Sequence, residues 1–153
     1  MPAMGALQRA AFEAVLMPML PAEFEFSSIE AWERSLADVL ADAGVRGLVK
    51  EDKGLSGLVI YGTCRDADAG SAIGEIRALF AHPDRRRTGI GRELVTRACE
   101  ELAEMGYAEV TLWSLQENDE ANAFYEALGF ERDGTTQVRE RLGAQEARYR
   151  RSL

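Results

Sequence analysis

Hydrophobic and polar residues alternate along this chain with two different periods. Apolar residues spaced three and four apart predict helices over 6–17, between Ser27 and Gly44, over 91–105 and over 119–128. Runs of apolar and β-branched residues predict strands over 45–50, 55–64, 72–81, 109–115, 130–138 and 147–152. This order of elements predicts an α/β or α+β fold, in which helices flank a mixed central sheet.

Length and composition favour one soluble domain over residues 1–153. Of the 153 residues, 46% are hydrophobic and 29% are charged, which is typical of a domain that needs no disulfide or metal to fold. No apolar stretch approaches the length of a membrane span, and the N-terminus lacks the basic start and apolar run of a signal peptide. We therefore expect a cytoplasmic protein with no membrane partner.

The charge balance narrows the range of ligands. A net charge of −8 disfavours nucleic acid and anionic membranes as partners. With a single histidine and two distant cysteines, Cys64 and Cys99, the sequence predicts no metal site and two reduced thiols. Four arginines, however, gather around Asp84 between residues 84 and 92. A basic island in an acidic protein indicates a small anionic ligand.

This basic island lies between a predicted strand and a predicted helix. The strand ends at Pro83, Gly89 and Gly91 follow, and the helix begins at once. Free N–H groups at a helix N-terminus bind phosphate, and glycines let the backbone approach a ligand closely. The segment is therefore a candidate pyrophosphate site. The alternative is a tight connection with solvated arginines.

Two segments resemble motifs of the GNAT family of N-acetyltransferases. The first follows the family pattern Arg/Gln-x-x-Gly-x-Gly/Ala and reads Arg86-Arg87-Thr88-Gly89-Ile90-Gly91. The second, residues 118–130, follows the pattern Asn-x-x-Ala-x-x-x-Tyr-x-x-x-Gly-Phe. The resemblance covers about residue 45 to the C-terminus and implies the GNAT fold. Two motifs in the right order are more specific than either alone.

The resemblance implies an acetyl-CoA or other acyl-CoA donor, and direct transfer of the acyl group to an amine. Backbone N–H groups over 87–92 would hold the pyrophosphate, and the backbone of residues 79–81 would pair with the pantetheine arm and polarise the thioester carbonyl. Asn118 would contact the same arm. The implied cofactor-binding residues are Leu79, Phe80, Ala81, Arg86, Arg87, Thr88, Gly89, Ile90, Gly91, Arg92 and Asn118.

Two residues are candidates for proton transfer. Tyr125 would lie near the sulfur, and its reference pKa of about 10 makes it a proton donor at neutral pH, although it also belongs to an apolar helical stripe that core packing explains. Glu75 is the base candidate, and its alternative is an exposed or ion-paired residue, with Arg77 as partner. His82, at the rim of the loop, is a less favoured base.

The chain departs from the family pattern at its start. The family begins with a strand before its first helix, but residues 1–5 are too few and poor in β-formers. The strand is absent, or the sequence starts too late, or another chain supplies that edge. An unpaired edge would invite a homodimer.

The amine acceptor is less defined than the donor. Trp113 stands where the subgroup that acetylates ribosomal-protein N-termini keeps a catalytic glutamate, which argues against that subgroup. Acceptor specificity in this fold comes from the segments that are here 18–28 and 134–145. The first contains Glu23, Phe24, Glu25 and Phe26, which would receive a cationic amine or form a solvated loop.

The sequence therefore predicts an acetyltransferase acting on a primary amine of a small molecule or protein. A non-catalytic acyl-CoA-binding module is the alternative. An acyltransferase toxin acting on aminoacyl-tRNA is disfavoured by the net charge of −8.

Overall fold

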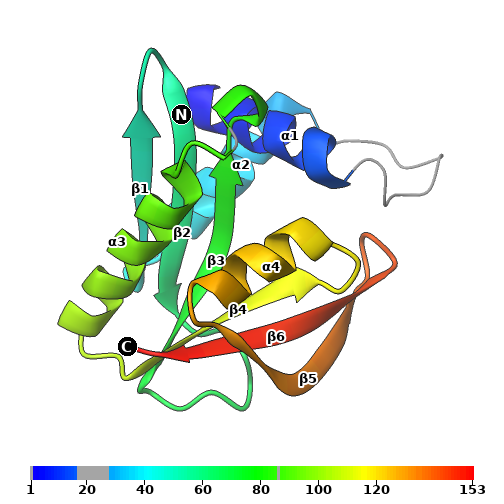
Figure 1. Ribbon diagram of the computed structural model, residues 1–153. Helices are drawn as coiled ribbons and strands as arrows, with labels where there is room; N and C mark the ends of the chain where they lie inside the picture. Colours follow the sequence, from blue (N-terminus) through cyan, green and yellow to red (C-terminus); the bar gives the residue numbers. More distant parts are fainter. Residues whose placement is uncertain (1, 17–27, 86) are drawn as a thin grey trace.

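The chain folds into one mixed sheet with helices on both faces (Figure 1). The computed structural model describes residues 2–16, 28–85 and 87–153, without the side chains of Pro2, Val15 and Leu16. Its elements in chain order are α1 (Pro2–Leu16), α2 (Ile29–Leu40), β1 (Val45–Glu51), β2 (Leu55–Thr63), β3 (Ile73–Ala81), a 3₁₀ turn η2 (Pro83–Arg85), α3 (Ile90–Glu104), β4 (Glu109–Leu115), α4 (Asp119–Ala127), β5 (Glu131–Arg139) and β6 (Ala144–Ser152).

The strands lie in the order β1-β2-β3-β4-β6-β5. Only β3 and β4 run parallel, and all other neighbours are antiparallel. The mixed sheet predicted from the sequence is confirmed. No strand precedes α1 within the described residues, and β1 forms one edge of the sheet.

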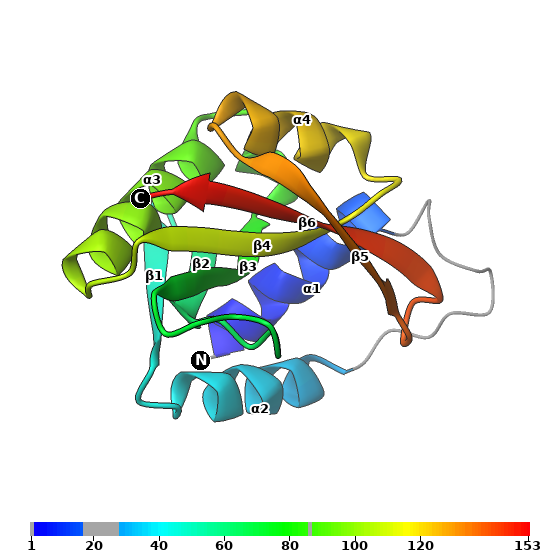
Figure 2. The same ribbon diagram turned by 90° about the horizontal axis from the view of Figure 1, so that it is seen from below.

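Two layers of helices bury the two faces of the sheet. Figure 2 shows α3 and α4 on one side of the strands and α1 and α2 on the other. Val59 and Tyr61 of β2 pack in the α3 cluster, whereas Leu58 and Ile60 pack with α1 and α2. Because both faces are covered, β2 is buried at nearly every position and not only at alternate ones.

The parallel pair β3 and β4 separates soon after it begins. Ile73–Glu75 pair with Glu109–Thr111, and no further pairing joins the two strands, so they diverge as Figure 1 shows. A β-bulge at Arg77 accompanies the divergence, because Ile60 pairs with Ala78 and Tyr61 pairs with Ile76. Residues 76–81 of β3 therefore lack a strand partner on the side toward β4.

The described part of the chain contains no helix with the length and hydropathy needed to cross a membrane. It also contains no group of three or more His, Cys, Asp or Glu side chains arranged to hold a metal ion.

Candidate active site

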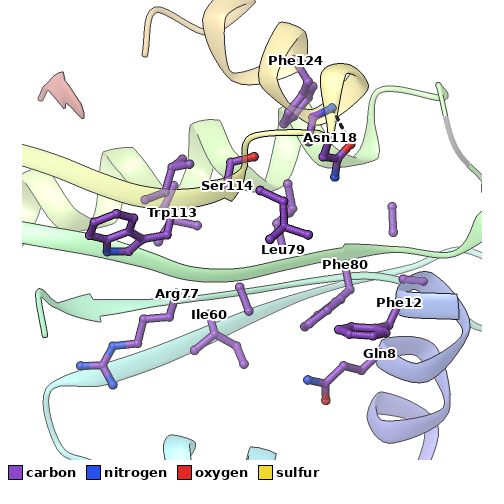
Figure 3. Close-up of a pocket in the computed structure, with 18 of the residues that line it drawn as sticks. Gln8, Phe12, Ile60, Arg77, Leu79, Phe80, Trp113, Ser114, Asn118 and Phe124 are labelled. Atoms are coloured by element: carbon purple, nitrogen blue, oxygen red, sulfur yellow. Dashed lines mark hydrogen bonds between the residues drawn. The ribbon is translucent and has the colours of Figure 1, made fainter. Parts of the chain in front are cut away.

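A cavity of about 600 Å³ lies where β3 and β4 diverge. Figure 3 shows Leu79 on the same side of β3 as Asn118 and Phe124, which belong to the α4 region. Phe80 points to the opposite side, toward Phe12 of α1. We call these two parts of the cavity the α4 side and the α1 side.

The N-terminus of α3 opens onto the α4 side. Its N-cap residue, Gly89, has a φ of 84°, and no side chain caps the helix. The first hydrogen bond of the helix runs from the Glu93 N–H to the Gly89 carbonyl at 3.0 Å, so earlier N–H groups have no acceptor within the helix. A Cβ atom on Gly89 would meet nothing within 4 Å, whereas one on Gly91 would lie 3.2 Å from Phe124. The first position is thus open to a ligand, and the second lets α3 approach α4.

Most of the predicted cofactor-binding residues meet at this cavity. Thr88 and Arg92 do not line it, although Thr88 donates a hydrogen bond to the Arg85 carbonyl and Arg92 follows in the first turn of α3. Arg86 lies outside the described residues. Those that line the cavity are Leu79, Phe80, Ala81, Arg87, Gly89, Ile90, Gly91 and Asn118.

Two asparagines fix α4 against the end of β4. Asn118 is the N-cap, and its Oδ1 accepts a hydrogen bond from the Ala121 N–H at 3.2 Å (Figure 3). Asn122 is 5% exposed, and its Oδ1 accepts from the Ser114 hydroxyl at 2.8 Å. The Asn122 Nδ2 donates to the carbonyls of Leu115 and Gln116. The start of α4 is therefore held at the mouth of the cavity.

Tyr125 lines the cavity from α4. Its ring packs edge-on against Phe124 and Phe130, with centroids 5.2 and 5.9 Å away. Among the residues the structure describes, none forms a hydrogen bond with its phenol oxygen. Burial raises the pKa of Tyr125 to about 12, so the phenol stays protonated at neutral pH. The ring therefore packs as the core interpretation expects, and the residue also borders the cavity, whereas its role as an acid stays a prediction.

Glu75 forms an ion pair with Arg65, not with Arg77. Its side chain is buried, and it accepts hydrogen bonds from the Arg65 backbone N–H, Nε and Nη2 at 3.0, 3.1 and 2.8 Å. Arg77 donates instead to the Thr63 carbonyl at 2.8 Å. Arg65 lines the cavity, and Glu75 lies behind it.

The other sequence candidates take different places. His82 does not line the cavity, and its Nδ1 accepts a hydrogen bond from the Asp84 N–H at 3.2 Å. Trp113 forms part of the cavity wall. The acidic segment 18–27 lies outside the described residues, whereas the 134–145 segment brings Arg139 and Arg141 to the cavity.

The sequence of this chain matches the profile of the acetyltransferase (GNAT) family over residues 9–130. The chain belongs to the GNAT family of acetyltransferases. Two curated relatives are similar to shorter stretches. A mycothiol acetyltransferase from Kocuria rhizophila is 41% identical over 61 residues, which are 40% of this chain and 20% of the relative. An uncharacterized N-acetyltransferase from Methanocaldococcus jannaschii is 42% identical over 59 residues, 39% of this chain and 26% of the relative. The matches thus span only about a fifth to a quarter of these relatives.

Solved structures share the GNAT fold over nearly the whole chain. The ribosomal-protein-alanine N-acetyltransferase from Brucella melitensis has a TM-score of 0.78 at 23% identity, covering 99% of this chain and 93% of that one. The PaiA N-acetyltransferase from Thermoplasma acidophilum, solved in complex with coenzyme A, has a TM-score of 0.73 at 17% identity, covering 95% and 89%. The predicted family and fold are confirmed.

Some residues of this GNAT cavity were not predicted from the sequence. Glu146 of β6 is 6% exposed and lines the α1 side, where its Oε1 accepts from Gln137 Nε2 at 3.1 Å. Gln8 lines the same side from α1. The alternation of β6 indicates which face Glu146 occupies, but only the pairing of β6 with β4 brings that face to the cavity.

Proposed function

We propose that this protein transfers an acetyl group from acetyl-CoA to the primary amine of a small molecule or protein, by direct attack of the amine. One observation carries the proposal: the unpaired half of β3, residues 76–81, and the uncapped N-terminus of α3 border one cavity. The names of two similar proteins, a mycothiol acetyltransferase and an N-acetyltransferase in complex with coenzyme A, support the donor and the type of acceptor.

The two backbone features suit the two ends of the donor. The N–H groups at the start of α3 bind the pyrophosphate, because the positive end of the helix dipole favours anions. Arg87 and Arg85 add positive charge beside them. The backbone of Leu79, Phe80 and Ala81 pairs with the amide groups of the pantetheine arm as an added strand does. Asn118 contacts the arm from the other wall of the cavity.

Acetyl-CoA supplies an activated acyl group whose leaving group is a thiolate. As the new C–N bond forms and the C–S bond breaks, a backbone N–H of β3 stabilises the negative charge that develops on the carbonyl oxygen. Tyr125 donates the proton that the sulfur takes up, and a base receives the proton that the amine loses.

Two carboxylates are candidates for that base. Glu75 is the one predicted from the sequence, and it would act through water past Arg65. Glu146 borders the cavity itself. Glu75→Gln weakens an ion pair in the sheet, so it lowers stability as well as rate. Glu146→Gln is expected to change chiefly the rate and its dependence on pH.

Thermal unfolding with acetyl-CoA tests the proposal, and ATP is the control for general phosphate binding. At 100 times Kd, acetyl-CoA adds about 2.7 kcal/mol of stability. For a chain of this length, that is a rise in Tm of roughly 5–11 °C. Thiol release with a panel of amines then measures turnover. No shift at millimolar acetyl-CoA would contradict the donor. A shift without turnover of any amine or peptide would indicate an acyl-CoA-binding module instead.

A further inference from the structure

The α1 side of the cavity indicates what kind of amine this enzyme accepts. We propose that the acceptor is a small apolar amino acid, and that Arg77 binds its carboxylate. This inference rests on the proposed function, because it names the acceptor for the same site.

Arginines outnumber carboxylates in the cavity wall. Among the described residues that line it there are six arginines and two glutamates, and no Lys, His or Asp. Arg85 and Arg87 lie with Glu120 near the start of α3 and α4, where the donor binds. The remaining charged residues of the wall are Arg65, Arg77, Arg139, Arg141 and Glu146. Two of the six arginines are already paired near the donor, because Arg85 lies 3.0 Å from Asp52 and Arg87 lies 3.8 Å from Glu120.

Arg77 differs from Arg65 and Arg139 because it has no carboxylate partner among the described residues. Arg65 pairs with Glu75 at 2.8 Å, and Arg139 lies 3.9 Å from Glu146. Arg77 makes one hydrogen bond, from Nη2 to the Thr63 carbonyl at 2.8 Å. No carboxylate of the described residues lies within 4.0 Å of it, and its Nε is buried without a hydrogen-bond partner. A buried donor without an acceptor costs free energy, and a bound carboxylate would recover it.

A second buried polar atom without a partner lies in the wall of the same cavity. In the part of the chain that the structure describes, only Gln8 Oε1 and Arg77 Nε are buried side-chain atoms without a hydrogen-bond partner. Both residues line this cavity, and Figure 3 shows them on one side of β3 with Ile60 between. One atom accepts and the other donates. Because Ile60 lies between them, one amino acid does not reach both atoms, and the carboxylate is assigned to Arg77, the donor of the two.

Apolar side chains separate the two polar atoms. Phe12 of α1 and Trp32 of α2 meet edge to face, with ring centroids 5.1 Å apart, and Ile60 and Phe80 face them from the sheet. These four side chains form an apolar surface beside Gln8 and Ser35, and an apolar side chain packs on it at no cost of desolvating a charge. The acceptor therefore combines an amine, a carboxylate and an apolar body.

Matched pairs of acceptors test the carboxylate directly. Thiol release from acetyl-CoA measures the turnover of leucine and phenylalanine. It also measures the turnover of the two amines that differ from them only by lacking the carboxylate. We expect kcat/KM to be about 10- to 100-fold higher for the amino acids, the ratio that one charge-assisted hydrogen bond provides. Equal or faster turnover of the decarboxylated amines overturns the inference.

Substitution of Arg77 tests which residue binds the carboxylate. Arg77→Gln is expected to raise KM for the amino acids about 10-fold or more, and so to reduce their advantage over the decarboxylated amines by about the same factor. Arg77→Lys keeps the charge and recovers part of the affinity. Arg46→Gln is the matched control, because Arg46 is exposed on β1 and lies outside the cavity. An unchanged preference in Arg77→Gln assigns the carboxylate to another group and contradicts the role of Arg77.

The acetyl-CoA thermal shift distinguishes failure of the proposed acceptor from failure of the proposed function. A variant or wild-type protein that shows the shift has an intact donor site, so failure of every amino acid in the panel then counts against the acceptor class alone. Loss of the shift in the wild-type protein counts against the proposed function.

Discussion

At the scale of single residues, Tyr125 combines two environments. Its ring belongs to an aromatic cluster with Phe124 and Phe130, and the residue also borders the cavity. Burial raises its pKa to about 12, so the phenol is protonated at every pH at which the folded enzyme would normally be assayed. The aromatic cluster fixes the ring, and the protonated hydroxyl is the group that could donate a proton.

Removing that hydroxyl should slow turnover and leave donor binding intact. We expect Tyr125→Phe to lower kcat about 100-fold, the usual contribution of a general acid, with the Kd for acetyl-CoA changed less than about three-fold. The pH–rate profile of the wild-type enzyme should show no ionisation from Tyr125 below about pH 11. Tyr107→Phe is the control, because the Tyr107 hydroxyl lies 3.0 Å from the Thr63 hydroxyl and outside the cavity. Full activity in Tyr125→Phe would exclude the acid role.

Some residues of the site have a signal in the sequence and others have none. Asn118 and Tyr125 were located by the spacing of a family motif. The partner of Glu75 was predicted wrongly, because Arg65 comes from the loop after β2 and residue spacing within β3 does not reveal it. Gln8 is one of three polar residues of α1, with Arg9 and Glu13, and its unpaired oxygen appears only when α1 packs on the sheet.

At the scale of elements, α3 and α4 both begin at the cavity, but their caps differ. Asn118 caps α4 with its side chain, whereas Gly89 leaves the first turn of α3 open. The sequence predicted both starts, because glycines and asparagine mark helix boundaries. It did not predict the buried contacts of Asn122, which depend on how α4 folds back onto the end of β4.

A bulky side chain at the start of α3 should close the donor site. We expect Gly89→Trp to abolish the acetyl-CoA thermal shift, because the space next to Gly89 is where the pyrophosphate would bind. Gly106→Trp is the matched control: Gly106 also has a positive φ and open space, but lies beyond the other end of α3. Both variants strain the backbone similarly. Equal thermal shifts in the two variants would place the donor elsewhere.

Removing the Asn122 amide should loosen α4. Asn122→Ala leaves the carbonyls of Leu115 and Gln116 without their donor, so we expect a loss of about 1–3 kcal/mol in the free energy of unfolding. Asn118→Ala removes only a cap and should cost about 1 kcal/mol. Denaturant unfolding measures both. A smaller loss for Asn122 than for Asn118 would contradict this ranking.

At the scale of the whole molecule, Arg148 joins segments that are distant in sequence. It is 5% exposed and binds Asp66 and Asp68 of the β2–β3 loop and Asp133 of β5. Its guanidinium also lies over the Trp113 ring, 5.7 Å from the centroid. The sequence predicted the strands along the chain but not this network, because nothing local relates Arg148 to residues about 80 positions earlier. The homodimer expected from the β1 edge stays a prediction.

The Arg148 network should make stability sensitive to acid. The hydrogen bond from Arg148 lowers the pKa of Asp68. Burial raises the pKa of Asp133, but hydrogen bonds from the Thr135 N–H and Arg148 outweigh it and lower the pKa. Depressed aspartate pKa values stabilise the fold above the unfolded pKa of about 3.9, and this contribution is lost as pH falls below it.

Replacing Arg148 tests this directly. We expect Arg148→Leu to lose about 2–3 kcal/mol at pH 7, less than a fully buried pair because its aspartates still contact water, and to weaken the acid dependence below about pH 4. Arg97→Leu is the control on the surface of α3, with an expected change under about 0.5 kcal/mol. Denaturant unfolding from pH 2 to 7 measures both. If the free energy of unfolding of Arg148→Leu falls below about pH 4 as steeply as that of the wild-type protein, the network is not the source of the acid dependence.

The divergence of β3 and β4 leaves the sheet as two three-stranded units. One contains β1, β2 and β3, the other contains β4, β6 and β5, and three residue pairs join them. A donor that pairs with β3 on one side and contacts α4 on the other acts as a cross-link between these units. Amide exchange near residues 73–75 and 109–111 should therefore slow on binding acetyl-CoA, although neither stretch lines the cavity. The enzyme would become more rigid where the two units join each time it binds acetyl-CoA.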